Sequence, residues 1–222
     1  MNVSENKLVD ESSNNLRAID AEQRVNLVRI MAIAGFYFIH LMHYYAPRLG
    51  DSVVGWLGFD SGKPFPANAH LAVTVLALGW LMQAFAVYFM LQQRRAPDWL
   101  AMATTCGDLF WLTAILTLST GPKSPMVVGY FLILIMTGLR FNLRLVRIAT
   151  VATIAAYLFL LGAAKWPRGL LKEIEIESVP RHHQLMIIVA LLFAGILIGQ
   201  IVRHGYAIAD DIARRWQEKG QQ

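Results

Sequence analysis

Six long apolar stretches dominate this sequence and restrict what it can fold into. A helix needs about 20 mostly apolar residues to cross the hydrocarbon core of a bilayer. The bilayer interior offers no water to unpaired backbone groups, so such spans are helical. The sequence therefore predicts an all-α, polytopic membrane protein with a bundle of six transmembrane helices. The predicted spans are residues 25–46, 69–91, 97–119, 125–141, 144–166 and 183–204.

The composition agrees with this class. Hydrophobic residues make up 56% of the chain and charged residues only 16%, whereas about 25% of the residues of a soluble domain are charged. The polar first 24 residues contain no basic region followed by a small-residue cleavage site, so no removable signal peptide is predicted. We divide the chain into an N-terminal segment (1–24), a transmembrane domain (25–204) and a cytoplasmic helical stub (205–222).

The basic residues orient the predicted bundle. Thirteen of the 20 Lys and Arg residues lie in the N-terminal region (counted to include Arg29), at 94–95, in the 140–147 connection and near the C-terminus. The other three connections hold seven. Short cytoplasmic loops favour Lys and Arg, so both termini are predicted to be cytoplasmic. This placement accounts for the net charge of +5 without a nucleic-acid partner.

Five of the six histidines are predicted at the outer ends of three helices. His40 and His43 lie in "GFYFIHLMHYY" near the end of the first span, and His70 begins the second span. His182 and His183 lie at the entry to the last span. Ionisable residues within spans are costly and tend to mark function, and neutral imidazole is the commonest metal ligand. Taken singly, His70, His182 and His183 have a simpler interpretation as polar residues of the membrane interface.

The joint placement of the histidines indicates a bound metal or metal-porphyrin. "HLMH" lacks the glutamate and the spacing of a zinc protease. A zinc or copper site would need three or four imidazoles, whereas a haem takes one or two axial histidines in an apolar slot. The aromatic surroundings favour haem b, in one or two copies. The preferred ligands are His43, His70 and His183, followed by His40 and His182. The cations available for the haem propionates are Arg48, Lys63, Arg168 and Arg181.

Asp108, in "ATTCGDLFWLT", is the only acidic residue deep within a predicted span. An unpaired buried carboxylate is expensive, so this side chain is predicted to face the bundle interior. Two interpretations are open. Asp108 either ties helices together by hydrogen bonding to a Thr, Tyr or Arg, or it acts in gating, proton relay or ligand binding. Gln83 and Gln200 are predicted to form interhelical hydrogen bonds.

The last predicted span contains "GILIG", which places Gly195 and Gly199 four residues apart. Small residues at this spacing allow close helix packing, either within the bundle or in a dimer. The helix is predicted to continue into the cytoplasm with a short coiled-coil seam, which favours a homodimer. A solvated amphipathic tail is the alternative. The seam residues are Ile201, Gly205, Ile208 and Ile212.

Several segments resemble those of known membrane receptors. "GFYFIHLMHYY", "LRFNLRLVRIATVATIAAYLFLLG" and "GQIVRHGYAIA" are similar to the six-helix membrane anchors of sensor kinases and class III adenylate cyclases, in particular to quorum-sensing histidine kinases that detect small α-hydroxyketones. "VPRHHQLM" also resembles anchors of bacterial Ser/Thr kinases. The resemblance implies a receptor in a bacterial plasma membrane, with a kinase or cyclase output domain after Gln222. This chain contains no catalytic motif, so no enzymatic activity is predicted.

These observations favour a haem-binding membrane sensor that signals through its last helix. The first alternative is a cofactor-free receptor for a small hydrophobic signal, with histidines as hydrogen-bonding groups in the pocket. The second alternative is a b-type cytochrome, which the one-sided placement of the histidines disfavours. A transporter is favoured least, because the sequence shows no internal repeat.

Overall fold

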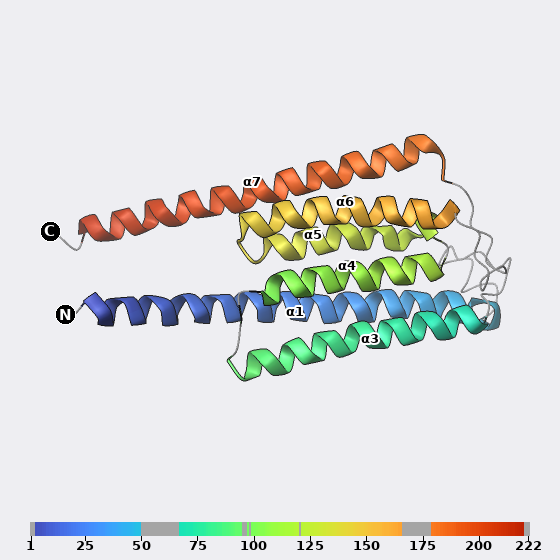
Figure 1. Cartoon of the computed structure of the whole chain (residues 1–222), viewed down its shortest axis with the longest axis horizontal. Helices are drawn as coiled ribbons and strands as arrows, with labels where there is room; N and C mark the ends of the chain where they lie inside the picture. The colour runs from blue at the N-terminus through green and yellow to red at the C-terminus, as the bar shows by residue number, and fades with distance from the viewer. Residues whose placement is uncertain are drawn as a thin grey trace.

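The computed structural model describes residues 3–49, 67–94, 97, 99–119, 121–165 and 179–219, and the regular elements within these ranges are all helical. The elongated bundle is shown in Figure 1. Its α-helices are α1 (Val3–Leu49), α3 (Ala67–Gln92), α4 (Leu100–Leu118), α5 (Gly129–Gly138), α6 (Leu143–Lys165) and α7 (Arg181–Lys219). Two 3₁₀ turns, η1 (Gly121–Lys123) and η2 (Pro125–Val128), precede α5.

Five helical segments are long and apolar enough to cross a bilayer, which indicates a membrane protein. They are Ile19–Met42, Ala67–Gln92, Leu100–Leu118, Leu143–Lys165 and Arg181–Ala209. The fourth predicted span, 125–141, corresponds to the shorter apolar segment Pro125–Gly138. At 1.5–2 Å per residue this segment is only about 20–25 Å long, against a hydrocarbon core of about 30 Å.

Local chain geometry limits the length of α5. Gly121 has a φ of 71° and Pro125 is the first residue of η2, so the chain approaches α5 through turns instead of a continuous helix. At the other end, Phe141 has a φ of 49°, a left-handed conformation that breaks the helix before α6 begins. A non-glycine residue in this region is uncommon and marks a tight connection.

The packing order of the helices keeps the first helix, α1, apart from the last helix, α7. The contacting pairs are α1 with α3, α3 with α4, α4 with α6, and α6 with α7, while α5 packs against α4, α6 and α7 (Figure 1). Tyr130 of α5 and Tyr157 of α6 are fully buried in the central core, with ring centroids 6.3 Å apart. The histidine-bearing ends of α1 and α3 are therefore on the opposite flank of the bundle from α7.

The first and last helices are longer than the spans they contain. α1 runs without a break across the predicted boundary at residue 24, and α7 continues past residue 204 to Lys219. In Figure 1 both helices project beyond their neighbours at the same end of the bundle, where the N- and C-termini lie. Residues 50–66, which include Lys63, and residues 166–178, which include Arg168, lie outside the described residues.

Candidate functional site

A pair of imidazoles joins the ends of α1 and α3. His40 Nε2 and His70 Nδ1 are 3.0 Å apart, within hydrogen-bonding distance, and the ring planes differ by only 15°. Tyr44 stacks on His70, with ring centroids 3.8 Å apart. The residue His40 is only 9% exposed. The structure thus brings together two of the five histidines that the sequence placed at this end of the bundle.

Hydroxyl groups extend this polar layer one turn along α3. The Thr74 hydroxyl donates to the main-chain carbonyl of His70 (2.8 Å) and lies 3.2 Å from the hydroxyl of Tyr37 on α1. His40 and Tyr37, three residues apart on α1, therefore contact successive turns of α3. This arrangement fixes the orientation of α1 against α3 at the outer end predicted from the sequence.

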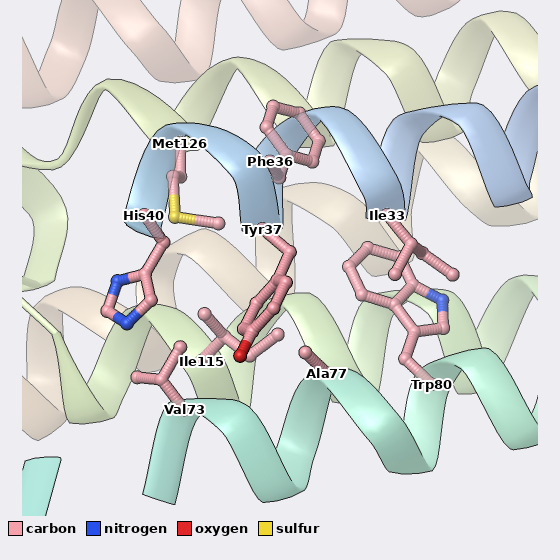
Figure 2. A pocket seen from close by; sticks show the side chains of 9 residues that line it. All are labelled: Ile33, Phe36, Tyr37, His40, Val73, Ala77, Trp80, Ile115 and Met126. Carbon is pink, nitrogen blue, oxygen red and sulfur yellow. The ribbon is translucent and has the colours of Figure 1, made fainter. Parts of the chain in front are cut away.

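A small pocket lies directly beneath this polar layer. Figure 2 shows Tyr37 and His40 reaching from α1 toward α3, with the Trp80 indole rising from α3 further along. The free space in the pocket is about 10 Å³, about what one water molecule needs and far below the roughly 300–1,000 Å³ of typical ligand sites. Its lining is almost wholly apolar or aromatic, with the imidazole and the phenol as polar groups. The lining residues are Ile33, Phe36, Tyr37, His40, Val73, Ala77, Trp80, Ile115 and Met126.

The other predicted haem residues lie elsewhere or are not described. His182 and His183 are exposed in the first turn of α7, next to exposed Arg181. The centroids of their two rings are 4.4 Å apart. α7 packs against α5 and α6, whereas the imidazole pair lies between α1 and α3. His43 and Arg48 are in the last turns of α1, but their side chains lie outside the described part of the structure.

The paired imidazoles do not form a bis-histidine haem site in the arrangement described. A metal–imidazole bond is about 2 Å long, so two imidazoles on opposite sides of one iron have nitrogens about 4 Å apart. The His40 and His70 nitrogens are hydrogen-bonded at 3.0 Å instead, and the rings would have to separate to accept iron. Among the described residues, no three His, Cys, Asp or Glu side chains are arranged to hold a metal ion. Haem binding remains a prediction.

A buried ion pair occupies the layer below the pocket. Arg29 Nε donates to both carboxylate oxygens of Asp108, at 2.8 and 3.0 Å, and joins α1 to α4. The Trp80 indole N–H donates to the same carboxylate at 2.8 Å. Arg29 Nη1 donates to Asn26 Oδ1 (2.7 Å), and Asn26 Nδ2 donates to the main-chain carbonyl of Ala84 (3.0 Å). The side chains of Arg29 and Asp108 are 0% and 2% exposed. Three helices are therefore tied together by one charged network.

The network also explains the predicted role of Gln83. Its Nε2 lies 3.4 Å from Asp108 Oδ1, and its Oε1 accepts a 2.8 Å hydrogen bond from the Trp111 indole. The prediction of interhelical hydrogen bonding is therefore confirmed for Gln83. Gln200, by contrast, is exposed on α7. For Asp108, the structure provides the arginine partner that one of the two sequence interpretations required.

A second buried ion pair lies nearer the end at which the termini project. Arg140, which follows α5, contacts Glu22 of α1 through Nε and Nη2, at 2.7 and 3.0 Å. Its two terminal nitrogens also donate to the hydroxyls of Thr104 and Thr105 on α4, at 2.8 and 2.7 Å. One guanidinium thus connects α1, α4 and the α5–α6 connection.

The sequence interpretation missed the structural role of Arg29. It counted Arg29 and Arg140 only as basic residues that set the orientation, yet both side chains are buried in ion pairs. A signal was available in the spacing of the polar residues in α1. Glu22, Asn26 and Arg29 recur at intervals of four and three residues, and His40 lies 11 residues, about three turns, further on. This spacing places all four on one face, which is the interior face.

Gly195 and Gly199 contribute to packing within the bundle. A Cβ atom at Gly195 would lie 2.2 Å from Thr150 Oγ1, so the missing side chain permits close contact between α6 and α7. At Gly199 the nearest atom would be Leu143 Cδ1 at 3.5 Å, an ordinary contact. The first glycine therefore serves the α6–α7 interface, which was one of the two predicted uses of the motif.

Comparison with known proteins adds no family assignment: no protein-family model, no curated protein and no solved structure matches this chain. The resemblance to receptor anchors therefore rests on the sequence segments alone.

Proposed function

We propose that this chain is the receptor domain of a membrane sensor and that it binds a small, largely apolar molecule in the pocket between α1, α3 and α4. The single observation that carries this proposal is the pocket in Figure 2, an aromatic and aliphatic cavity with His40 at one end. Such a lining, with few polar groups to orient the ligand, is typical of small-molecule sites. A short-chain ketone or alcohol, with its oxygen at the imidazole, would enter by pushing apart the side chains that line this small space.

The position of the pocket suggests how occupancy would reach the rest of the bundle. Trp80 lines the pocket with its ring and donates its N–H to Asp108, so a shift of this indole would alter the charged network. Thr104 and Thr105, one turn along α4, contact Arg140. A ligand changes the balance between two bundle states only if it binds them unequally. The Trp80 indole is the group at which this difference would arise.

The signal would leave through α7. The residue that follows Arg140, Phe141, accepts a hydrogen bond from the Tyr206 hydroxyl through its main-chain carbonyl. Its ring lies against Gly205, where a Cβ atom would meet Phe141 at 3.2 Å. The helix then extends to Lys219. This proposal includes the predicted arrangement of six spans with cytoplasmic termini in a bacterial plasma membrane, a homodimer, and a kinase or cyclase output domain that acts with this chain.

Ligand-dependent thermal stabilisation tests the receptor function. The purified protein would be unfolded, with tryptophan fluorescence as readout, in a series of 2-alkanones, α-hydroxyketones and matched alkanes. A ligand at about 100 times its Kd stabilises by about 2.7 kcal/mol. We expect a chain-length optimum among the ketones that disappears in Ala77→Leu, which fills the pocket. Ala86→Leu, on an exposed face of the same helix, should keep it. Equal responses of the two variants would contradict the proposal.

A haem-binding sensor is the second candidate, because two imidazoles from different helices face each other at the end of the pocket. One absorption spectrum tests this candidate. Protein purified from haem-replete cells is expected to show a Soret band that shifts on reduction and is lost in His70→Ala. His204→Ala is the control, since His204 is exposed on α7. Colourless protein would contradict the haem sensor and leave the cofactor-free receptor.

A further inference from the structure

A second cavity lies between α6 and α7, away from the imidazole pair. This α6–α7 groove has a volume of about 320 Å³ and opens on the outside of the bundle. Most of its wall is apolar, but four polar side chains line it as well: Arg147 and Thr150 from α6, and Gln200 and Arg203 from α7. The remaining lining residues are Leu143, Val146, Val151, Leu192, Gly195, Ile196 and Gly199.

The two glycines explain why the groove exists. Close packing at Gly195, against Thr150, brings the helices together along one line. One turn further along α7, Leu143 is the only described residue that would lie within 4 Å of a Cβ atom at Gly199, so space remains beside this glycine. The result is a largely apolar channel between the two helices, in which Gly199 contributes no side chain. An extended hydrocarbon chain fits this shape.

The two arginines that line the groove point to an anionic ligand. Arg147 and Arg203 are exposed, and neither guanidinium forms an ion pair within the described parts of the chain. Both lie near the end of the bundle where α6 begins and α7 projects. An arginine fork matches the geometry of a phosphate group. Basic pockets between transmembrane helices recur as sites for anionic lipid head groups.

We propose that the α6–α7 groove binds an anionic glycerophospholipid. The phosphate lies between Arg147 and Arg203, Gln200 contacts the head group, and one acyl chain follows the apolar floor past Gly199 and Gly195. A second copy of the chain is a poorer occupant, because a symmetric contact would bring the arginines of both copies together. The groove is separate from the aromatic pocket, so the lipid site does not depend on the ligand of the sensor.

The experiment is native mass spectrometry of the full chain in detergent, titrated with dioleoyl-phosphatidylglycerol or dioleoyl-phosphatidylcholine. The wild-type protein should bind one phosphatidylglycerol in preference to phosphatidylcholine. Each cation near a membrane surface contributes about 1 kcal/mol, so Arg147→Gln and Arg203→Gln should each lower this preference about fivefold, and the double variant about thirtyfold. Arg144→Gln is the matched control. Arg144 is an exposed arginine on the same helix that does not line the groove.

A steric variant tests the acyl-chain part of the proposal. Gly199→Leu should fill the floor and abolish the single tight phosphatidylglycerol, while an unchanged melting temperature shows that the bundle is still folded. Equal binding of the two lipids, or an equal loss in Arg144→Gln, would overturn the proposal. A protein dimer that dissociates in Gly199→Leu, with no lipid preference, would assign the groove to a second copy and overturn it as well.

Discussion

Arg29 of α1 and Asp108 of α4, 79 residues apart in sequence, form an ion pair that is almost completely buried. Both carboxylate oxygens accept from one Nε, Trp80 and Gln83 also contact the carboxylate, and Asn26 accepts from the guanidinium. A charge in a bilayer interior is costly unless it is paired. This pair is therefore the contact that lets both helices carry a charged residue inside the bundle.

Removing one member of this pair should be much more harmful than removing both. Asp108→Asn or Arg29→Gln leaves an uncompensated buried group, and breaking a buried pair costs about 3–5 kcal/mol. The double variant Arg29→Met/Asp108→Leu should recover most of this loss, because it leaves no buried charge. Thermal unfolding in detergent measures all three variants. Additive losses in the double variant would show that the two residues do not act as a pair.

Arg140 should not tolerate replacement by lysine. Its guanidinium contacts Glu22 and the hydroxyls of Thr104 and Thr105 at the same time. Lysine has one compact ammonium group and cannot reproduce this fork. We expect Arg140→Lys to lower the free energy of unfolding by about 1–3 kcal/mol, the range for a buried group that loses its hydrogen bonds. Arg144→Lys, at an exposed position, should have no measurable effect.

The two glycines of α7 should differ sharply when each is replaced by alanine. Gly195→Ala places a methyl group 2.2 Å from Thr150 Oγ1, and overpacking of this kind costs about 1–3 kcal/mol. Gly199→Ala makes only an ordinary contact and should be close to neutral. Gly195→Ala/Thr150→Ala should regain part of the loss. Melting temperatures in one detergent check all three variants, and equal effects at the two glycines would contradict the packing described for α6 and α7.

Cysteine labelling tests the arrangement in the membrane. Cys106 is exposed on α4, within a candidate span, so acyl chains should shield it in intact membranes. Maleimide reacts with the thiolate, and a thiol among acyl chains does not ionise readily. A water-soluble maleimide should therefore label Cys106 only after detergent is added. In a Cys106→Ala background, Lys165→Cys and Arg214→Cys should react from opposite sides of the membrane. Labelling of both from the same side would contradict the predicted orientation.

The sequence predicted helix positions well because the length of an apolar stretch depends only on consecutive residues. The predicted spans 69–91 and 144–166 differ by one or two residues from Ala67–Gln92 and Leu143–Lys165. The 125–141 segment was harder to predict, since the turns around Gly121 and Phe141 depend on backbone conformation.

The candidate site was predicted less completely, for a geometric reason. Hydropathy and loop charge give the depth of a residue in the membrane, but not its position around the bundle. His40, His70 and His183 share a predicted depth, yet the first two meet between α1 and α3 while the third lies on α7, which packs against α5 and α6. Arg29 was misinterpreted because its partner Asp108 lies in the third predicted span, far away in sequence. Only the packing order of the helices brings these residues together.

The polar face of α1 has a consequence for the synthesis of the protein. Arg29 leaves the ribosome 79 residues ahead of Asp108, and an arginine at the centre of a lone helix opposes insertion by about 2.5–3.5 kcal/mol. Glu22 likewise precedes Arg140 by 118 residues. We therefore expect the newly made α1 to stay beside the translocon until α4 and then the α5–α6 connection emerge. Release into lipid would then be coupled to assembly of the complete bundle.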